Sequence, residues 1–284
     1  MEPQREHSLS SGVNCQKVLI TGARGRLARH AIAELTKDFS LVLTDRLEPE
    51  AILENYRQAD LTDLSQTVAV MKGIDTVLHL AITSYPPSPK GVEPSPQELA
   101  DYQARMLQVN PLSTFHVFEA ARLAHVKRVI YLSSLTVYFG DKHRSHYQET
   151  DTPDPPDLYA CTKLLGEHIG RVYFQTHGLE VLTLRLGQPY PANNIYDETW
   201  QKSRRARSMY VTVEDFARAT RCAVECDVPF GVFNIVSASD NQRFDIRAAQ
   251  SIGYRPIGYF SGEGLSFHPD GNVPRSDAPV ATHD

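Results

Sequence analysis

The chain has 284 residues, of which 41% are hydrophobic and 22% charged, and its formal net charge is −5. This composition is ordinary for a soluble globular protein, and the negative charge argues against general binding to nucleic acid. The length suits one large α/β domain or a main domain with a small appendage, and no apolar run approaches the length of a membrane span.

The N-terminal residues and the cysteines bear on the cellular compartment of the protein. Residues 1–14 contain no apolar segment of the kind that secretory signals carry, so we expect a disordered leader. The four cysteines lack the spacing of a disulfide framework and fit a reducing cytoplasm: Cys15, Cys161, Cys222 and Cys226. Cys222 and Cys226 could share one helical face, but a metal site would need two more ligands and no paired His or Cys lies nearby, so we expect buried free thiols there.

Over the first two-thirds of the chain, predicted strands and helices alternate. Six segments predict strands, at 17–23, 40–45, 56–63, 75–81, 127–134 and 180–187, and the first of them is a short β-branched run that ends in Gly. Helical patterns lie at 24–38, from near Thr62, at 97–125 with a break or kink at Pro111, and at 158–177. Such alternation predicts an α/β fold with a doubly wound parallel sheet of the Rossmann type.

After Gly187 the pattern weakens. We expect a short strand near 209–213, a helix from about Glu214, a strand at 231–238 and a helix at 241–256. The predicted division is a dinucleotide-binding domain at 15–187, a small substrate-binding lobe at 188–263 that is interleaved with the last strand, and an irregular tail at 264–284.

Two polar loops follow predicted strands. Residues 84–98 hold five prolines directly after the fourth strand, where loops border the ligand crevice of open α/β sheets. We interpret these residues as part of a rim or lid over the ligand site; the alternative is an ordinary surface loop. The loop 140–157 carries clustered polar side chains that either contact a substrate or are solvated charge: His143, Arg144, His146 and Tyr147.

The first predicted strand runs into the sequence TGARGRLA, where Gly22, Gly25 and Ala28 form a G-x-x-G-x-x-A turn before a helix. Glycines there allow close approach to a pyrophosphate, and the helix start offers free N–H groups. Asp45, at the end of the second strand, suits ribose hydroxyls and repels a 2′-phosphate, which favours NAD. Arg46 keeps NADP open, and a turn that serves packing only is the alternative.

A second group of residues indicates proton transfer. Ser133 and Ser134 end the fifth strand, and Tyr159 stands four residues before Lys163 in a predicted helix, so both side chains share one face. A phenol has a pKa of about 10, which a nearby ammonium would lower towards neutrality. Ser134, Tyr159 and Lys163 are therefore the candidate catalytic residues, with a serine hydroxyl orienting the substrate oxygen.

Together these motifs resemble the extended short-chain dehydrogenases/reductases, the NAD-dependent epimerase/dehydratase family, over residues 16 to about 238. The motifs are TGARGRLA, Asp45, DLTD, HLA, Asn110, SSLTVYFG, YACTK and LRLGQPYP, in that order along the chain. The resemblance implies a set of cofactor contacts: Gly22, Arg24, Gly25, Arg26, Leu27, Asp45, Arg46, Asp60, Leu61, Leu80, Ala81, Asn110, Tyr159 and Lys163. It implies a substrate set as well: Thr83, Ser84, Thr136, Gln188 and Asn193.

The C-terminal part departs from many sugar-nucleotide enzymes of this family, whose longer C-terminal domains bind a nucleoside diphosphate. The short lobe and the sequence GQPYPANN are similar to uronate dehydrogenases, which oxidise a free sugar acid to its lactone. The arginine expected after the Asn-Asn pair is missing, because residues 195–197 are Ile, Tyr and Asp. Three arginines further on could replace it, bind a diphosphate, or be solvated charge: Arg204, Arg205 and Arg207.

The sequence thus predicts an NAD-dependent oxidoreductase acting on a hydroxyl or carbonyl of a small sugar or sugar acid. The alternatives are a nucleotide-sugar epimerase or dehydratase that recycles its NAD, and a non-catalytic regulator that senses the dinucleotide. The family resemblance also implies a homodimer through the helices at 97–125 and 158–177. From the charge and the apolar runs we expect no nucleic-acid or membrane partner.

Overall fold

The computed structural model describes residues 16–49, 54–83, 94–141, 143–190 and 203–274. Several predictions fall outside these residues: the leader 1–14, Cys15, Ser84, most of the loop 84–98, and Asn193.

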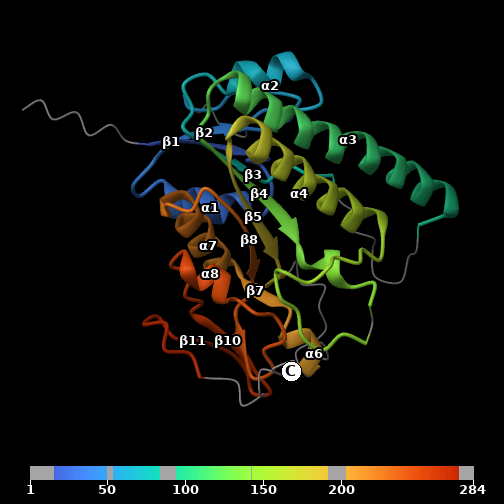
Figure 1. Ribbon diagram of the computed structural model, residues 1–284, viewed down its shortest axis with the longest axis vertical. Helices are drawn as coiled ribbons and strands as arrows, with labels where there is room; N and C mark the ends of the chain where they lie inside the picture. The colour runs from blue at the N-terminus through green and yellow to red at the C-terminus, as the bar shows by residue number, and fades with distance from the viewer. Residues whose placement is uncertain (1–15, 50–53, 84–93, 142, 191–202, 275–284) are drawn as a thin grey trace, which may run out of the picture.

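A six-stranded parallel sheet forms the centre of the molecule (Figure 1). Its strands are β1 (Lys17–Thr21), β2 (Ser40–Thr44), β3 (Thr76–His79), β4 (Arg128–Ser134), β5 (Glu180–Leu186) and β8 (Phe230–Ile235), in the order β2-β1-β3-β4-β5-β8. This arrangement confirms the predicted doubly wound α/β fold. It also brings the carboxyl ends of all six strands to one edge of the sheet.

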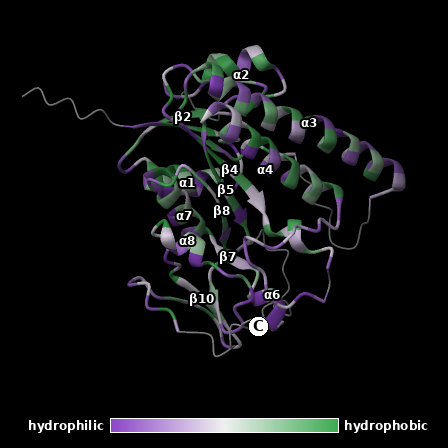
Figure 2. Cartoon of the chain, in the orientation of Figure 1, coloured by the Kyte–Doolittle hydropathy of each residue, from purple (hydrophilic) through white to green (hydrophobic). Residues whose placement is uncertain are grey.

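Helices cover both faces of the sheet (Figure 1). One layer contains α1 (Ala28–Leu35), α7 (Val213–Glu225) and α8 (Arg247–Ser251), and the other α2 (Leu64–Val70), α3 (Pro96–Leu123) and α4 (Leu158–His177). Successive strand residues point to opposite faces, so Val18 and Ile20 join the core under α1 while Leu19 joins the core under α3. Figure 2 shows hydrophobic and hydrophilic residues alternating along α3, as a half-covered helix requires.

Local signals set the ends of the long helices. Ser95 and Glu98 form a capping box at the start of α3, and Asp157 accepts the N–H of Ala160 at the start of α4. Gly178 ends α4 in the left-handed conformation, with φ at 67°. The predicted break at Pro111 is wrong, because α3 continues through it as one helix, with buried residues on both sides of the proline.

Two other predicted elements are also wrong. Residues 56–63 make no strand: only Tyr56 bridges Leu43 of β2, and α2 starts at Leu64 after its cap Asp63. The predicted helix at 241–256 shrinks to α8. Its first part is extended because Phe244 pairs with Tyr147, whose N–H donates to the carbonyl of Arg243.

The C-terminal lobe consists of short elements. Strands β6 (Gln188–Tyr190) and β7 (Tyr210–Thr212) pair in parallel, and α6 (Arg204–Arg207) precedes β7. A second small sheet joins β9 (Ala238–Ser239), β10 (Gly258–Ser261) and β11 (Gly264–Phe267). Strand β11 lies in the segment predicted to be an irregular tail, so that expectation fails for residues 264–267. In the described part of the chain, no helix is long and apolar enough to cross a membrane.

Candidate active site

Two adjoining cavities open at the carboxyl edge of the sheet. The smaller has a volume of about 230 Å³ and lies near the ends of β1, β2 and β3. The larger, of about 610 Å³, lies between the glycine turn, the end of β4 and the start of α4. They share four lining residues and so form a continuous site along the edge: Gly22, Gly25, Leu80 and Ile82.

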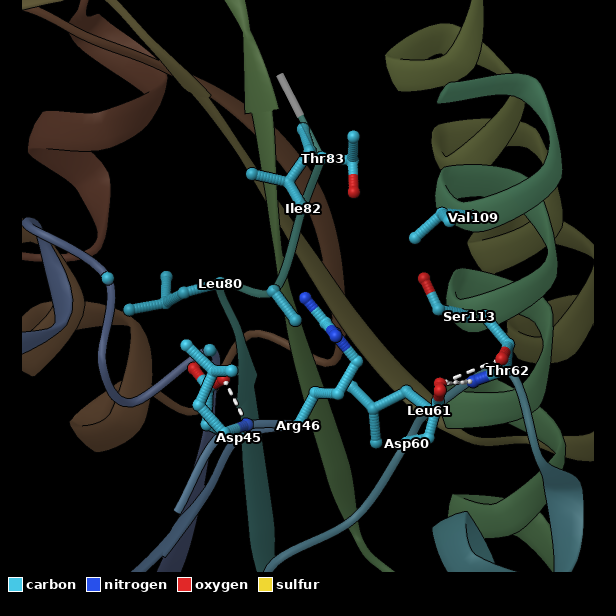
Figure 3. Close-up of a pocket in the computed structure, with 14 residues that line it drawn as sticks. Asp45, Arg46, Asp60, Leu61, Thr62, Leu80, Ile82, Thr83, Val109 and Ser113 are labelled. Atoms are coloured by element: carbon cyan, nitrogen blue, oxygen red, sulfur yellow. Dashed lines mark hydrogen bonds between the residues drawn. The ribbon is translucent and has the colours of Figure 1, made fainter. Parts of the chain in front are cut away.

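The smaller cavity collects residues from three strand ends (Figure 3). Its walls include Asp45, Arg46, Asp60, Leu61, Ala81 and Thr83 of the predicted set. The carboxylate of Asp45 accepts the backbone N–H groups of Arg24 and Leu47, both at 3.1 Å, which fixes its position. Figure 3 shows the side chain of Arg46 extending into the cavity from the end of β2.

Two predicted cofactor residues do not line this cavity but form hydrogen bonds to residues that do. Asn110 is buried and does not line either cavity; it accepts the N–H of Thr83 and donates to its carbonyl, both at 2.8 Å. It thereby holds the segment after β3 against α3. Arg24 contributes its backbone N–H to Asp45 rather than a side chain to the lining.

The glycine turn is required by the fold itself. Gly22 has φ of 66°, and a Cβ there would lie 2.7 Å from Cα of Ala81. Beyond the turn, Leu27 at the start of α1 makes no side-chain capping bond, and the first turn of α1 has no acidic residue. Arg26, Leu27 and Ala28 line the larger cavity there. This uncapped helix start fits an anionic group.

Ser134, Tyr159 and Lys163 meet in the larger cavity. Ser134 ends β4, and its Oγ accepts from the N–H and hydroxyl of Thr136 at 3.2 and 3.0 Å. The first two turns of α4 carry Tyr159 and Lys163. The Lys163 ammonium donates to the carbonyl of Leu132 at 2.6 Å and lies 5.9 Å from the centre of the Tyr159 ring.

The protonation of this group differs from the expectation. Burial raises the pKa of Tyr159 to about 12, and a hydrogen bond with Ser134 only partly offsets that rise. Burial also lowers the pKa of Lys163 from 10.5 to about 7, against the opposing effect of the Glu167 carboxylate. The protein residues alone therefore keep Tyr159 as a neutral phenol at neutral pH.

A buried ion pair lies behind these residues and was missed in the sequence. The carboxylate of Glu167 accepts from Arg185 at 2.9 and 2.6 Å and from the Ser133 hydroxyl at 2.6 Å. Both charged side chains are more than nine-tenths buried. The spacing could have identified Glu167, because it stands four residues after Lys163 and so lies on the same face of the helix.

On the substrate side, Thr136 and Gln188 of the predicted set line the larger cavity. Phe139, Pro189 and Met209 line it too and were not predicted. Phe139 and Pro189 could have been found because they lie within the motifs SSLTVYFG and LRLGQPYP. Arg207, one of the three arginines considered for a substrate anion, is buried in a pair with Asp240 at 2.8 Å.

The three cysteines that the structure describes are free: Cys161 is exposed, and Cys222 and Cys226 are partly buried, not fully buried as expected. Among the described residues, no group of His, Cys, Asp or Glu side chains is placed to hold a metal ion.

Comparison with known proteins places this site in a family. Residues 18–235 match the model of the NAD dependent epimerase/dehydratase family. The L-arabinose 1-dehydrogenase (NAD(P)(+)) of Haloferax volcanii is 28% identical over 84% of this chain and 96% of its own length. The uronate dehydrogenase of Pseudomonas syringae is 29% identical over 84% of this chain and 81% of its own. The crystal structure of uronate dehydrogenase from Agrobacterium tumefaciens superposes with a TM-score of 0.69 at 24% identity, covering 87% of this chain and 86% of that chain. The chain therefore belongs to the NAD-dependent epimerase/dehydratase family.

Proposed function

We propose that this protein is an NAD-dependent oxidoreductase that transfers a hydride between nicotinamide and a hydroxyl or carbonyl of a small sugar or sugar acid. The observation that carries the proposal is the meeting of Ser134, Tyr159 and Lys163 in one cavity that continues to the glycine turn and Asp45. The names of the relatives, an arabinose and a uronate dehydrogenase, support the class of substrate.

The residues of the two cavities fit the dinucleotide. The uncapped start of α1 would hold the pyrophosphate, and the Asp45 carboxylate would accept the ribose hydroxyls. Asp60 and Leu61 would border the adenine. Bound NAD would supply or accept the hydride. Arg46 points into the same cavity, and one relative is named for both NAD and NADP, so NADP is the cofactor to compare.

Tyr159 moves the proton in this proposal. As a neutral phenol with a raised pKa, it is ready to donate to a carbonyl oxygen in the direction of reduction. In the direction of oxidation Tyr159 must first lose its own proton to solvent, and the Lys163 ammonium nearby would stabilise the phenolate. The phenolate would then take the hydroxyl proton of the substrate and return to the neutral phenol. Ser134 would hold the substrate oxygen next to the phenol.

The substrate would lie between this trio and the lobe formed by residues 188–263. Gln188 and Met209 bring the lobe into the wall of the catalytic cavity, and Thr136 faces the same space. The role of the lobe, and of Thr83 and Thr136 as substrate contacts, is part of the proposal.

An assay of reduced cofactor tests the reaction. Aldoses, uronic acids and nucleotide sugars are each incubated with NAD and with NADP, and the absorbance of the reduced cofactor is followed. We expect steady formation of NADH with an aldose or a uronic acid. A nucleotide-sugar epimerase would convert its substrate with no net NADH, which would refute the oxidoreductase proposal in favour of the epimerase. No conversion of any substrate, with NAD still bound, would favour the regulator.

We further propose a cytoplasmic homodimer. Helices α3 and α4 lie side by side and carry six exposed large hydrophobic residues: Leu107, Leu112, Phe115, Leu123, Leu165 and Val172. Two copies of this face would make a four-helix interface and remove the apolar side chains from water. Light scattering at micromolar concentration should give twice the chain mass, and a monomeric mass would contradict the dimer. The exposed thiol of Cys161 fits a reducing compartment.

A further inference from the structure

A third cavity, of about 630 Å³, lies in the C-terminal lobe and shares no lining residue with the catalytic cavities. It is bounded by the loop before α4, the segment from β9 to α8, and the residues after β11. An aromatic cluster of Phe139, Tyr147 and Phe244 stands between it and the catalytic cavity, because Phe139 lines the catalytic side and the other two line the third cavity.

Basic side chains dominate the polar part of its walls. Four arginines line it, namely Arg144, Arg243, Arg247 and Arg255, against two carboxylates, Asp151 and Asp245. The carboxylates are already engaged. Asp245 pairs with Arg247, and Asp151 lies 3.3 Å from Arg144.

Arg243 is the unusual member. Its side chain is more than nine-tenths buried, and the described residues provide it with no acidic partner. Its Nε donates to the carbonyl of Ser145 at 2.9 Å and its Nη2 to that of Arg144, while Nη1 is buried without a hydrogen bond. A buried cation without a counter-ion is costly, and burial lowers the pKa of this guanidinium.

A second unsatisfied atom belongs to the same walls. The buried hydroxyl of Ser239, which lines this cavity, has no hydrogen bond, just as Nη1 of Arg243 has none. Buried polar groups in folded proteins are rarely left unpaired, so these two atoms indicate a missing acceptor. Ile246, Pro256 and Val273 make an apolar part of the lining.

We propose that this cavity binds a small organic anion, whose carboxylate or phosphate pairs with Arg243 and Ser239 and whose apolar body lies against Ile246 and Val273. The oxyanion supplies the charge that Arg243 lacks and accepts from Nη1 and from the Ser239 hydroxyl. The site is separate from the catalytic cavities, so the ligand is neither the hydride donor nor its acceptor. Water in the cavity is the competing occupant.

Calorimetric titration of the full chain tests the site, with benzoate and phenyl phosphate as anionic probes and benzyl alcohol as their neutral counterpart. We expect saturable binding of at least one anion, with benzyl alcohol at least about tenfold weaker because it lacks the charge. The tighter of the two anions identifies the head group. Saturating NAD should not displace it. Competition with NAD, equal binding of benzyl alcohol, or no saturable binding of either anion would overturn the proposal.

Variants locate the binding. Arg243→Gln should weaken the anion at least about tenfold, and Ser239→Ala several-fold. Ser239→Ala removes an unpaired hydroxyl and should fold normally, so it keeps the test decisive if Arg243→Gln is unstable. Arg171→Gln, an exposed arginine on α4, is the control and should bind as the wild type does. Loss of binding in the control alone, or unchanged binding in Ser239→Ala, would contradict the assignment.

Discussion

Two buried arginines show how the two parts of the molecule differ. Arg185, behind the catalytic edge, is paired with Glu167 through two hydrogen bonds. Arg243, in the C-terminal lobe, contacts two carbonyls and the hydroxyl and ring of Tyr147, but no carboxylate among the described residues. Behind the catalytic edge the buried arginine has its counter-ion within the protein, whereas Arg243 has none among the described residues. The difference teaches that burial of an arginine is balanced by the fold itself in one region and, in our proposal, by a bound anion in the other.

Replacing Lys163, the proposed partner of Tyr159, should reduce activity strongly and separate function from stability. Lys163→Met removes an ammonium whose pKa burial lowers to about 7. We expect turnover to fall by about 10²-fold or more. Lys127→Met, an exposed lysine, is the control and should keep full activity.

The same variant should be more thermally stable than the wild type, because a charged lysine is unfavourable in that buried position. Below about pH 7 the lysine is protonated in both folded and unfolded chains, so its full penalty applies. As the pH rises from about 7 towards 10.5, the folded chain carries a neutral lysine and the penalty declines. The gain in Tm should therefore be largest below pH 7 and shrink above it; an opposite trend would show that Lys163 is not desolvated.

Removing each buried arginine in turn tests the comparison between the two regions. Arg185→Met leaves the Glu167 charge buried and uncompensated, so we expect a loss of about 3–5 kcal/mol in the free energy of unfolding. Arg243→Met leaves no charge behind and should cost about 1 kcal/mol. Urea unfolding measures both. Equal losses would mean that the two arginines are not in different electrostatic states.

Cofactor choice gives a smaller effect, at the end of β2. Asp45→Asn keeps a carbonyl oxygen for the backbone and removes the charge that repels a 2′-phosphate. The ratio of kcat/KM for NADP to that for NAD should rise about tenfold. Arg46→Gln is the matched change and should reduce the use of NADP while leaving NAD unaffected. An unchanged ratio in both variants would place the adenosine ribose elsewhere.

The smallest effect is expected where the lobe meets the catalytic cavity. Gln188→Ala should raise the KM of the sugar about threefold to tenfold, through loss of a hydrogen bond, without changing the Kd of NAD. The exposed Gln97→Ala on α3 is the control. A weaker affinity for NAD in Gln188→Ala would show that this residue belongs to the cofactor site instead.

The sequence predicts the structure correctly where short sequence patterns determine it. Gly22, Asp45 and Ser134 follow or end apolar strands, and Tyr159 and Lys163 have helical spacing, so their meeting follows from the topology of a parallel sheet. Glu167 obeys the same spacing, but its partner Arg185 lies on β5, and only the folded chain shows their contact.

The structure of the C-terminal lobe depends instead on contacts between residues that are far apart in the sequence. Residues 243–245 look helical in the sequence, yet they are extended because they pair with Tyr147, almost 100 positions earlier. No local pattern reports that pairing. The direction of the Tyr159 pKa was mispredicted for a related reason, since burial, which the sequence does not show, outweighs the nearby lysine.

The most direct test of the proposed chemistry is Tyr159→Phe, with NAD affinity measured by calorimetry and turnover by the absorbance of NADH. Phenylalanine keeps the ring and removes only the hydroxyl that moves the proton. We predict an unchanged Kd for NAD and a fall in turnover of about 10²–10⁴-fold. Substantial residual turnover with NAD bound as tightly as before would contradict the role of Tyr159 as the acid/base.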